Sequence, residues 1–510
     1  RPSEVAPALC RCSMLQHFPP TSPLPAAVAA AAYLNSLYGD WLDDDPLAIT
    51  DNDDVLCPRG LPGLFDNLSE VMAHDFWGVP MASPRSHLSY RPLAILSFRV
   101  QHCLSGFAGF HFHAANVVLH SAATHQFLHV ATHALPRPAA VLAALLFALH
   151  AVHVECVANT VGRAELLAAI AALRAIASYQ RLLRSRGDCD PSQGPTMPSV
   201  RMPATIQQRV QPEEAVTILR CGVYAGVGML CKEGALAALL VCAALDCFGA
   251  LRPPRAASRV AAAAVRVSCL GGLSLALLAA RLAVNSWRSP TFTAADNSAA
   301  FCETSLCRAL SVSYLYYLNL RLLALPDNLS HDWSTTTVPN LIDTSDPRLP
   351  LALLPYALLA ALAALALHRL LRRGRAALAT GLALLVLPYL PACHVFVTVG
   401  FTVAERVLYL PSAGTCLLAA QPLCRLLSAW PPTTRLATPL AAPLAPSLPR
   451  RLARAAGLLL AAAALGGHAV LAVRRNNDWR TNLSLLTSGV AHQPTNAKLQ
   501  YNLGRALYQL

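Results

Sequence analysis

Charged side chains are scarce in this chain of 510 residues. Asp, Glu, Lys and Arg together make up 13% of it, whereas about a quarter of a soluble domain is charged. Hydrophobic residues make up 55%, and the mean hydropathy is +0.43. This composition excludes an ordinary soluble enzyme or binding domain. It predicts a protein that crosses a membrane many times.

Strict alternation of polar and apolar residues is also missing from the apolar stretches, which are rich in Ala and Leu. Outer-membrane barrels are built from alternating strands, so the missing alternation favours transmembrane helices. We predict about eleven spans, near residues 24–39, 107–133, 138–155, 163–181, 215–231, 234–250, 262–284, 350–368, 376–397, 411–428 and 455–473. The segment 309–325 is apolar but bounded by Arg308 and Arg321, and we interpret it as interfacial or re-entrant.

Positive charge is concentrated in four connections between these spans. Their arginines are Arg181, Arg184, Arg186, Arg201 and Arg209; Arg252, Arg255, Arg259 and Arg266; Arg369, Arg372, Arg373 and Arg375; and Arg435, Arg450, Arg451 and Arg454. Short cytoplasmic loops hold an excess of Lys and Arg, so these connections should share the cytoplasmic face. The loops 40–106 and 285–349 and the C-terminal tail then lie on the other face. The net charge of +13 follows from topology and does not indicate nucleic-acid binding, because no basic stretch interleaved with aromatic residues is visible.

The predicted lumenal or extracellular face carries three N-glycosylation sequons, at Asn67, Asn328 and Asn482. We expect a glycan on at least one of them. The sixteen cysteines give no readable disulfide framework, since most lie in apolar spans. Cys302 and Cys307 lie on the same face as the sequons and could pair. The Pro-rich segment 431–449 and the Pro/Ser/Gln-rich segment 187–212 are expected to be flexible linkers.

After the last span, residues 476–510 are polar with a helical pattern. From Asn496 onward the Leu-Gly and Tyr spacing resembles the start of a tetratricopeptide repeat, in which Gly504 would let two helices approach closely. An ordinary amphipathic tail is the alternative. We therefore predict a membrane module, 1–475, followed by the start of a repeat region, 476–510. Both chain ends are expected to be those of a fragment, and the first span to act as the targeting signal because no cleavable signal peptide is evident.

The acidic segment 40–45, with the sequence DWLDDD, directly follows the first apolar window and so lies at a membrane surface. Carboxylates are costly to desolvate, and several of them at a hydrocarbon boundary usually bind cations or handle protons. A solvated acidic loop is the alternative. This segment is the best indication of function in the sequence.

Further ionisable residues gather at predicted span ends on the same face. They lie in the motifs SHLSYRPL (86–93), HAVHVE (150–155), VGRAE (161–165), CKE (231–233), DNSAA (296–300) and ERVLYLPS (405–412). Ionisable groups at span ends face a cavity or water, so these motifs predict a polar site covered by loops. His150, His153 and Glu155 could be read as metal ligands, but no third His shares their helix face, and hydrogen bonding explains them equally well.

An ordered series of motifs resembles one family, the transmembrane and tetratricopeptide repeat (TMTC) proteins. The motifs are DDPLAI (44–49), DFWGVPM (75–81), SHLSYRPL (86–93), HFHAANVVLH (111–120), HAVHVECVANTVGRAELL (150–167), CKEG (231–234), VGFTVAERVLYLPS (399–412) and NAKLQYNLG (496–504). The resemblance covers nearly the whole chain. Three positions depart from the family pattern: Leu88 stands where Lys is usual, Ala151 where Pro is usual, and Gly234 where Gln is usual. Leu88 removes a positive charge near the expected site.

The resemblance implies an all-α membrane bundle of the GT-C glycosyltransferase type in the endoplasmic reticulum, with lumenal repeats. It also implies transfer of mannose from dolichyl phosphate mannose to Ser or Thr of cadherin-type extracellular domains. The lipid donor would be a co-substrate; no cofactor or metal is predicted, and a divalent-cation requirement stays open. A non-catalytic membrane scaffold whose repeats bind partners is the alternative, although an anchor needs only one span. A secondary transporter fits less well, since paired Gly/Pro breaks and internal repetition are missing.

For that reaction the sequence offers candidates for each role. The general base of an inverting displacement would be Asp44 or Asp45, with Asp43 also open. The leaving phosphate needs cationic partners, and the candidates are Arg91, Arg163, Arg406 and Lys232. Side chains expected to orient these groups are Glu165, Glu405, His87, His153 and Glu155. Structural ion pairing at span ends is the alternative for these charged residues.

Overall fold

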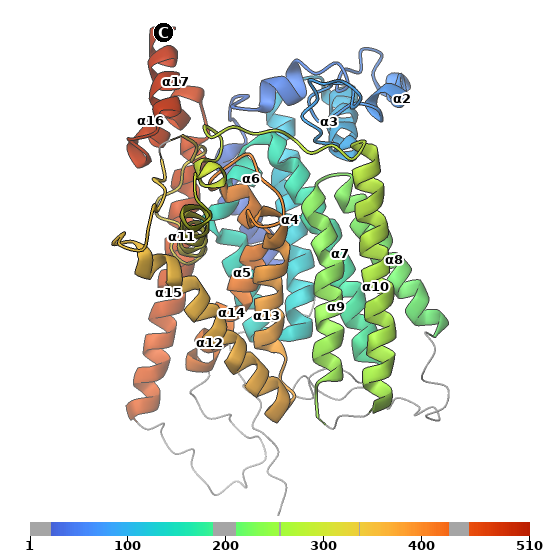
Figure 1. Ribbon diagram of the computed structural model, residues 1–510, viewed down its shortest axis with the longest axis vertical. Helices are drawn as coiled ribbons and strands as arrows, with labels where there is room; N and C mark the ends of the chain where they lie inside the picture. Colours follow the sequence, from blue (N-terminus) through green and yellow to red (C-terminus); the bar gives the residue numbers. More distant parts are fainter. Residues whose placement is uncertain (1–21, 187–210, 254–256, 336, 428–447, 510) are drawn as a thin grey trace, which may run out of the picture.

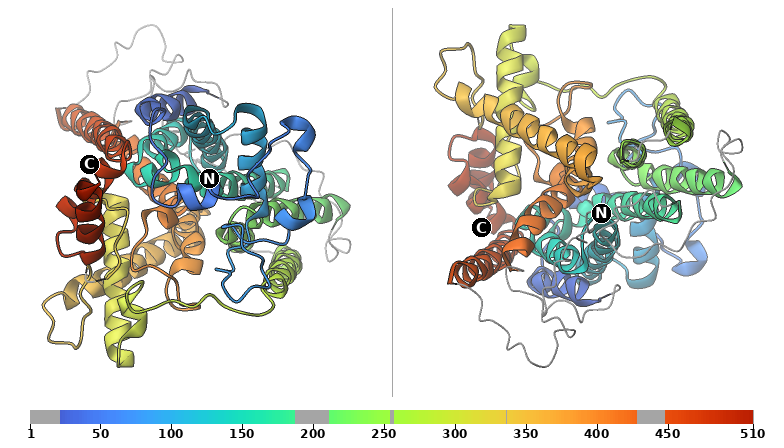
Figure 2. Two further views of the ribbon diagram at one scale, coloured as in Figure 1. Left: turned by 90° about the horizontal axis from the view of Figure 1, so that it is seen from above. Right: turned by 90° about the horizontal axis from the view of Figure 1, so that it is seen from below.

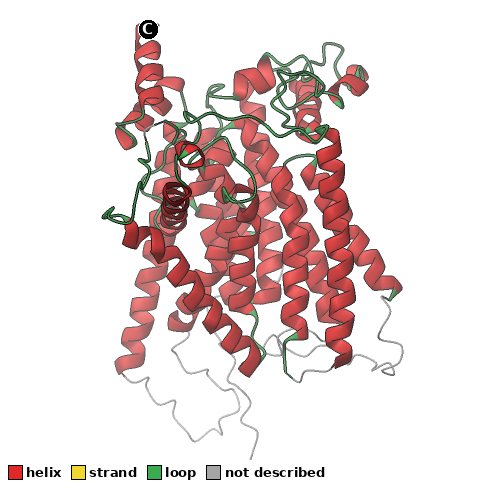
Figure 3. Cartoon of the chain, viewed as in Figure 1, coloured by secondary structure: helices red, strands yellow, loops and turns green. Residues whose placement is uncertain are grey.

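The computed structural model describes residues 22–186, 211–253, 257–335, 337–427 and 448–509. Within these ranges the protein is made of helices and loops without any β-strand (Figure 3). One isolated bridge joins His74 and Pro80. The predicted all-α class is therefore confirmed.

Long helices run roughly side by side and form one bundle (Figure 1). They are α4 (Gly109–Ala134), α5 (Arg137–Leu149), α7 (Arg163–Ser185), α8 (Pro212–Met229), α9 (Ala237–Ala250), α10 (Ala257–Val284), α12 (Leu349–Arg373), α13 (Ala377–Val386), α14 (Pro411–Leu427) and α15 (Leu448–Asp478). Ala and Leu dominate these segments, and both residues favour helix. Each helix coincides with a predicted apolar window, and the first window contains the short α1 (Leu24–Ala32).

Burial divides these helices into central and peripheral ones. The most apolar stretch of α7 is 78% buried, because α4, α8 and α9 pack around it. The corresponding stretch of α10 is only 11% buried, and those of α12 and α15 are 17% buried. A helix that is apolar on all sides but exposed is suited to contact with lipid. The outer helices therefore present the surface that a bilayer would cover.

Five helices among the described residues are long and apolar enough to cross a membrane. They are Thr160–Ser185, Glu233–Ala250, Ala257–Val284, Leu349–Arg373 and Arg451–Asp478. A sixth results if α5 and the short α6 (Val154–Ala158), which are bent by 48°, form one span. Ala377–Ala392 is apolar but shorter. Several membrane-spanning helices are thus supported, while the number of about eleven stays a prediction.

Helix ends that carry arginines and the large loops lie at opposite ends of the bundle (Figure 1). At the basic end, arginines such as Arg184 and Arg372 lie near the ends of α7 and α12. The loop end carries the loops 40–106 and 285–349 and two terminal helices, α16 (Asn482–His492) and α17 (Ala497–Tyr508). This separation agrees with the topology predicted from charge.

Some features of the predicted topology differ in the structure or lie outside it. Arg266 is not a loop residue: it lies within α10 and is buried there. Arg201, Arg209, Arg255 and Arg435 lie outside the described residues, as does nearly all of the predicted linkers 187–212 and 431–449.

The apolar segment 309–325 forms α11 (Ser305–Ala324), which lies across the bundle at the loop end. Figure 1 shows this helix almost end-on, and Figure 2 shows its length. An orientation across the other helices supports the interfacial interpretation of this segment.

Disulfide bonding at the loop end differs from the expectation. Cys57 is bonded to Cys103 on α3 (Pro92–Ser105), which closes the loop 40–106. Cys302 and Cys307 are free, so their predicted pairing was wrong. Their sulfur atoms instead lie 3.7 and 3.9 Å from the hydroxyl oxygen of Ser311. A disulfide in this loop is compatible with an oxidising compartment on that side of the membrane.

The terminal helices α16 and α17 form an antiparallel pair above the end of α15 (Figure 1). Their close approach occurs at Gly489, where a Cβ atom would lie 3.2 Å from the side chain of Leu499. Gly504 has open space at the corresponding position among the described residues, so the close helix approach expected there stays a prediction. The hairpin fits the predicted start of a repeat, and a longer solenoid stays a prediction.

Candidate active site

The acidic segment 40–45 lies at the loop end, where the chain leaves α1. The amide nitrogen of Asp40 donates a hydrogen bond of 2.9 Å to the carbonyl oxygen of Arg480, so this segment is attached to the turn after α15. Asp43 adopts a left-handed φ of 54°, which is uncommon for a residue with a side chain. This sharp turn gives the consecutive carboxylates different surroundings.

Asp45 is buried and binds the backbone. Its Oδ1 accepts a hydrogen bond of 2.8 Å from the amide of Val161, and its Oδ2 accepts bonds of 3.2 and 3.4 Å from the amides of Leu42 and Thr160. Burial raises the pKa of Asp45 to about 7, although these amides oppose the rise. With both oxygens occupied, Asp45 joins the acidic segment to the start of α7. Its oxygens are thus turned toward the protein backbone, and the prediction that Asp45 could serve as the base stays a prediction that this geometry does not favour.

Asp43 and Asp44 are more accessible. Asp43 is exposed and Asp44 is half-buried. Protein nevertheless surrounds the Asp43 carboxylate closely enough that desolvation, followed by repulsion from Asp44, raises its pKa to about 7. Arg406 and Lys498 oppose that rise. This adjacent pair of carboxylates therefore lies within electrostatic reach of two cations.

Arg406 provides the central cation of the site. Its Nη1 atom lies 2.6 Å from Oε1 of Glu155 on α6, and its backbone amide donates a bond of 2.8 Å to Oε2 of the same residue. Burial lowers the pKa of Arg406, but Glu155, Asp44 and Asp43 outweigh burial and raise it. The Arg406 side chain is 36% exposed, so the ion pair does not enclose it.

Three further ion pairs continue this charged cluster. Lys232 pairs with Glu165 near the start of α7. Glu233 lies 3.5 Å from Arg91 and 2.8 Å from Arg281. Burial, Arg91 and Arg406 lower the pKa of Lys232, while Glu165 opposes this shift. Glu165 therefore pairs with one of the predicted cations, Lys232, and not with an arginine, and its orienting role stays a prediction.

Arg163 does not belong to this cluster, contrary to the prediction. It is 2% exposed, and its three guanidinium nitrogens donate to the Asn116 side chain and to the carbonyl oxygens of Ser97 and Phe112 at 3.0 to 3.3 Å. The rings of Phe98 and Phe112 flank its guanidinium. Its role in this structure is to join α3, α4 and α7, because each of its nitrogens donates to a protein oxygen and burial keeps the guanidinium away from a phosphate.

Glu405 also differs from its predicted role. It is buried, and its Oε1 accepts a hydrogen bond of 2.5 Å from the amide of Ser330. The partner of Arg406 is Glu155, so Glu405 does not orient that arginine. Burial raises the pKa of Glu405 to about 8, with Arg475 opposing the rise. Glu405 instead fastens the loop 285–349 to the segment that carries Arg406.

The two predicted histidines lie in separate surroundings. His87 is exposed; its Nδ1 lies 2.7 Å from the hydroxyl of Ser89, and its backbone amide donates to Asp75. Burial and Arg91 lower the pKa of His87. His153 is fully buried within the bundle, with Nε2 2.7 Å from the hydroxyl of Ser412. The structure therefore brings His87 to the charged cluster and assigns His153 to the core.

Several residues of the site were given no role by the sequence. Arg281 pairs with Glu233 and also donates a hydrogen bond of 3.1 Å to the carbonyl oxygen of Leu88. The guanidinium of Arg281 therefore places a positive charge beside Leu88, the position at which the family usually has Lys. Lys498 on α17 pairs with Asp332 at 2.7 Å. Burial lowers the pKa of Lys498, but Asp332, Asp43 and Asp44 outweigh it and raise it. Only the folded chain brings these partners together, because Arg281 lies 48 positions from Glu233 and Lys498 lies 166 positions from Asp332.

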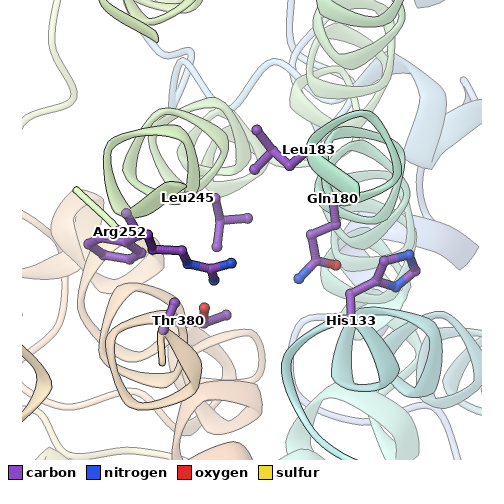
Figure 4. Close-up of a pocket in the computed structure, with 8 residues that line it drawn as sticks. His133, Gln180, Leu183, Leu245, Arg252 and Thr380 are labelled. Carbon is purple, nitrogen blue, oxygen red and sulfur yellow. The ribbon is translucent and has the colours of Figure 1, made fainter. Parts of the chain in front are cut away.

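The described residues provide no cluster of metal ligands, and a small cavity lies far from the charged cluster. No group of three or more His, Cys, Asp or Glu side chains in the described ranges is arranged to hold a metal ion. A cavity of about 30 Å³ lies at the basic end, where Arg252, Gln180 and Thr380 point into it (Figure 4). That volume is comparable to a single water molecule. The cavity is therefore far too small for a sugar, and it lies at the opposite end from the charged cluster.

Comparison with known proteins adds to this geometry. Residues 286–360 match the family model described as Protein O-mannosyl-transferase TMTC, DUF1736. The chain is 33% identical over 517 residues to Protein O-mannosyl-transferase TMTC4 of Mus musculus, covering 94% of this chain and 63% of that protein. For TMTC4 of Homo sapiens the identity is 33% over 529 residues, with 97% and 66% covered. For TMTC3 of Homo sapiens it is 31% over 496 residues, with 94% and 48% covered.

The chain thus spans between about half and two thirds of the length of these curated relatives. No solved structure matches it.

Proposed function

The chain belongs to the TMTC family, and from this membership and the charged cluster we propose that it transfers mannose from dolichyl phosphate mannose to Ser or Thr hydroxyls of secretory proteins. The observation that carries the proposal is the placement of accessible carboxylates, Asp43 and Asp44, beside Arg406 at one end of a membrane bundle. A lipid-linked sugar needs its charged head at such a boundary and its chain in the bilayer. The curated relatives are named protein O-mannosyl-transferases.

In the proposed step, the oxygen of the acceptor hydroxyl attacks the anomeric carbon of mannose. Asp44 takes the hydroxyl proton, and the bond from the anomeric carbon to the phosphate oxygen breaks with its electron pair on that oxygen. Dolichyl phosphate leaves as an anion, and the configuration at the anomeric carbon inverts. Asp44 is preferred over Asp45 because the oxygens of Asp45 are bound by three backbone amides. A positioned general base typically contributes about 10²- to 10⁴-fold to the rate.

Arg406 is the proposed main partner of the donor phosphate. It is accessible, and a planar guanidinium suits a phosphate better than an ammonium does. Arg91 and Lys232 extend the positive charge, and each is held by a carboxylate, Glu233 or Glu165. Such pairing orients the cations before the donor arrives, which lowers the entropy lost on binding.

The proposed compartment is the lumen of the endoplasmic reticulum, with cadherin-type extracellular domains as acceptors. The separation of charge between the two bundle ends supports this orientation, as does the disulfide at the loop end. The terminal hairpin lies beside the acidic segment through Arg480 and Lys498. Repeats continuing from this hairpin would therefore present an acceptor near the charged cluster.

The proposal is tested by mannosyl transfer from purified dolichyl phosphate mannose to a cadherin domain by protein reconstituted in nanodiscs. We expect Arg406→Ala to raise the donor KM by about 10- to 100-fold, because a charge-assisted phosphate contact is worth about 1.5–3 kcal/mol. Arg406→Lys keeps a charge opposite Glu155 and should recover part of the loss. Arg59→Ala removes an exposed arginine of the loop end that pairs with Asp66 and should leave KM unchanged.

Absence of transfer by the unsubstituted protein to every acceptor tested, under conditions where a curated relative is active, would contradict the proposed activity. Equal donor KM values in Arg406→Ala and Arg59→Ala would contradict the phosphate role of Arg406 alone.

Glycosylation tests the orientation independently. Among the three sequons, Asn67 is exposed in a turn, whereas Ser330 of the Asn328 sequon is buried and donates its hydroxyl proton to the carbonyl oxygen of Asp332. Asn482 begins α16, next to a capping box formed by Thr481 and Ser484. We expect Asn67→Gln to remove an endoglycosidase-sensitive increment of mass. A product insensitive to endoglycosidase at all three sites would contradict a lumenal loop end.

A further inference from the structure

Three consecutive apolar residues project from the connection between the helical turns η10 (Leu387–Ala392) and η11 (Glu405–Leu408). Val395, Phe396 and Val397 are 64%, 71% and 55% exposed. His394, directly before them, is buried, and the chain is buried again at Thr402. Exposed apolar side chains in a row are unfavourable in water, so their environment must be apolar in the working protein.

The connection is held firmly at both ends. The side-chain amide of Asn297, itself buried, donates to Nδ1 of His394 at 3.2 Å and to the carbonyl oxygen of Val399 at 2.9 Å. The hydroxyl of Tyr316 donates a bond of 2.6 Å to the carbonyl oxygen of Cys393. Thr402 donates to the carbonyl oxygen of Trp333. These hydrogen bonds fix the conformation of the connection, and in that conformation the three apolar side chains project outward.

The same connection leads directly into the charged cluster, because Arg406 lies in η11. Gly400 lies so close to the ring of Phe292 that a Cβ atom at that position would overlap it. The Phe292 ring in turn lies 5.9 Å from the ring of His87, centroid to centroid. The connection that carries the apolar tripeptide therefore contacts Phe292, which in turn contacts His87 beside the charged cluster.

We propose that Val395, Phe396 and Val397 bind the polyprenyl chain of the lipid-linked donor where it leaves the phosphate. This inference rests on the proposed function, since it specifies where the tail of that donor lies. The donor is an amphiphile with a charged head and a long branched hydrocarbon tail, and the structure offers a charged cluster with a fixed apolar loop beside it. Figure 1 shows the connection after α13 at the loop end of the bundle, beneath the segment that joins α10 to α11. A chain bound there could pass along the apolar outer helices into the bilayer.

The test compares two donors with the same head and different tails, dolichyl phosphate mannose and citronellyl phosphate mannose, in detergent solution. The triple variant Val395→Ser, Phe396→Ser and Val397→Ser is expected to raise KM for the dolichyl donor by about 10-fold, the loss that corresponds to removing a modest apolar contact. Its KM for the citronellyl donor and its kcat should stay near those of the unsubstituted protein. Ile342→Ser, which changes a similarly exposed (74%) apolar residue in the loop 285–349, should change neither KM.

A second measurement does not depend on catalysis. A photoreactive polyprenyl phosphate is expected to label the peptide containing residues 395–397, and the single variant Phe396→Ser should reduce the labelling several-fold. Labelling to the same extent by a photoreactive phosphatidylcholine would mean that the loop contacts bulk lipid only, and would overturn the proposal. Equal changes in KM for both donors, or none, would also overturn it. If the unsubstituted protein transfers no mannose but the polyprenyl probe labels this peptide specifically, the proposed function fails while the binding site stands.

Discussion

Asp44→Asn is expected to lower the rate of mannosyl transfer by about 10²- to 10⁴-fold, the usual contribution of a general base, without unfolding the protein. The carboxylate of Asp44 makes no hydrogen bond or ion pair with the described residues and is half-buried. An amide has nearly the same shape, so the substitution removes basicity and charge with little effect on packing. Initial-rate measurements with both substrates saturating should show the loss in kcat.

The matched control is Asp45→Asn, only one position away. The carboxylate of Asp45 accepts hydrogen bonds from the backbone amides of Leu42, Thr160 and Val161. In the Asn side chain one oxygen is replaced by an NH₂ group, which would face at least one of these N–H donors and could not accept its hydrogen bond. Unsatisfied buried donors cost about 1–3 kcal/mol each, so this variant should lose thermal stability. Asp44→Asn should melt like the unsubstituted protein. Full activity in Asp44→Asn, with loss of activity in a folded Asp43→Asn, would transfer the role of base to Asp43.

Most of the helical framework could be predicted because burial in lipid leaves a direct compositional signal. The apolar windows near 163–181 and 262–284 coincide with α7 and α10. The number of spans was harder to predict, because an apolar window does not reveal where a helix breaks. The window 376–397 contains ten residues of α13 followed by a helical turn with Pro388 and Pro391, and the window 138–155 is bent by 48°.

The sequence predicts which residues are candidates for the site, but it does not predict which of them pair with one another. Arg406 and Arg163 both lie in the first turn of a helical segment, η11 and α7, yet one is accessible and the other is enclosed by Phe98 and Phe112. Helix packing decides this difference, and no local pattern reports it. The same holds for Glu155, which lies 251 positions from Arg406. The Cys57–Cys103 bridge likewise spans 46 positions without a spacing motif.

The second large effect is expected at the basic end of the bundle, where four helices share one buried ionic network. Arg266 on α10 donates to both oxygens of Asp246 on α9, at 2.8 and 2.6 Å, and its Nη1 lies 3.2 Å from Glu214 on α8. The hydroxyl of Tyr179 on α7 donates a bond of 2.5 Å to the same Asp246. Arg266 and Asp246 are each 1% exposed, so water cannot replace either partner.

Arg266→Met should destabilise the protein by about 3–5 kcal/mol, because it leaves the buried charge of Asp246 without a counter-ion. Adding Asp246→Leu removes that charge as well, so the double variant should recover most of the lost stability, as expected for a buried ion pair replaced by apolar groups of similar volume. Thermal unfolding in one detergent, followed by intrinsic fluorescence, measures both. Arg321→Met, which breaks an ion pair with the exposed Asp327, serves as the control and should melt close to the unsubstituted protein.

Activity separates this network from the charged cluster. Because the network lies at the end of the bundle opposite to Asp44 and Arg406, mannosyl transfer per folded molecule should stay unchanged in the Arg266→Met and Asp246→Leu double variant. A melting temperature in Arg266→Met equal to that of Arg321→Met would mean that Asp246 is neutral in the folded protein, since only an uncharged carboxyl could lose its cation without cost. In that case the hydrogen bond from Tyr179 to Asp246 and the ion pair of Glu214 with Arg186, and not the pair of Asp246 with Arg266, would hold α7, α8 and α9 together at this end.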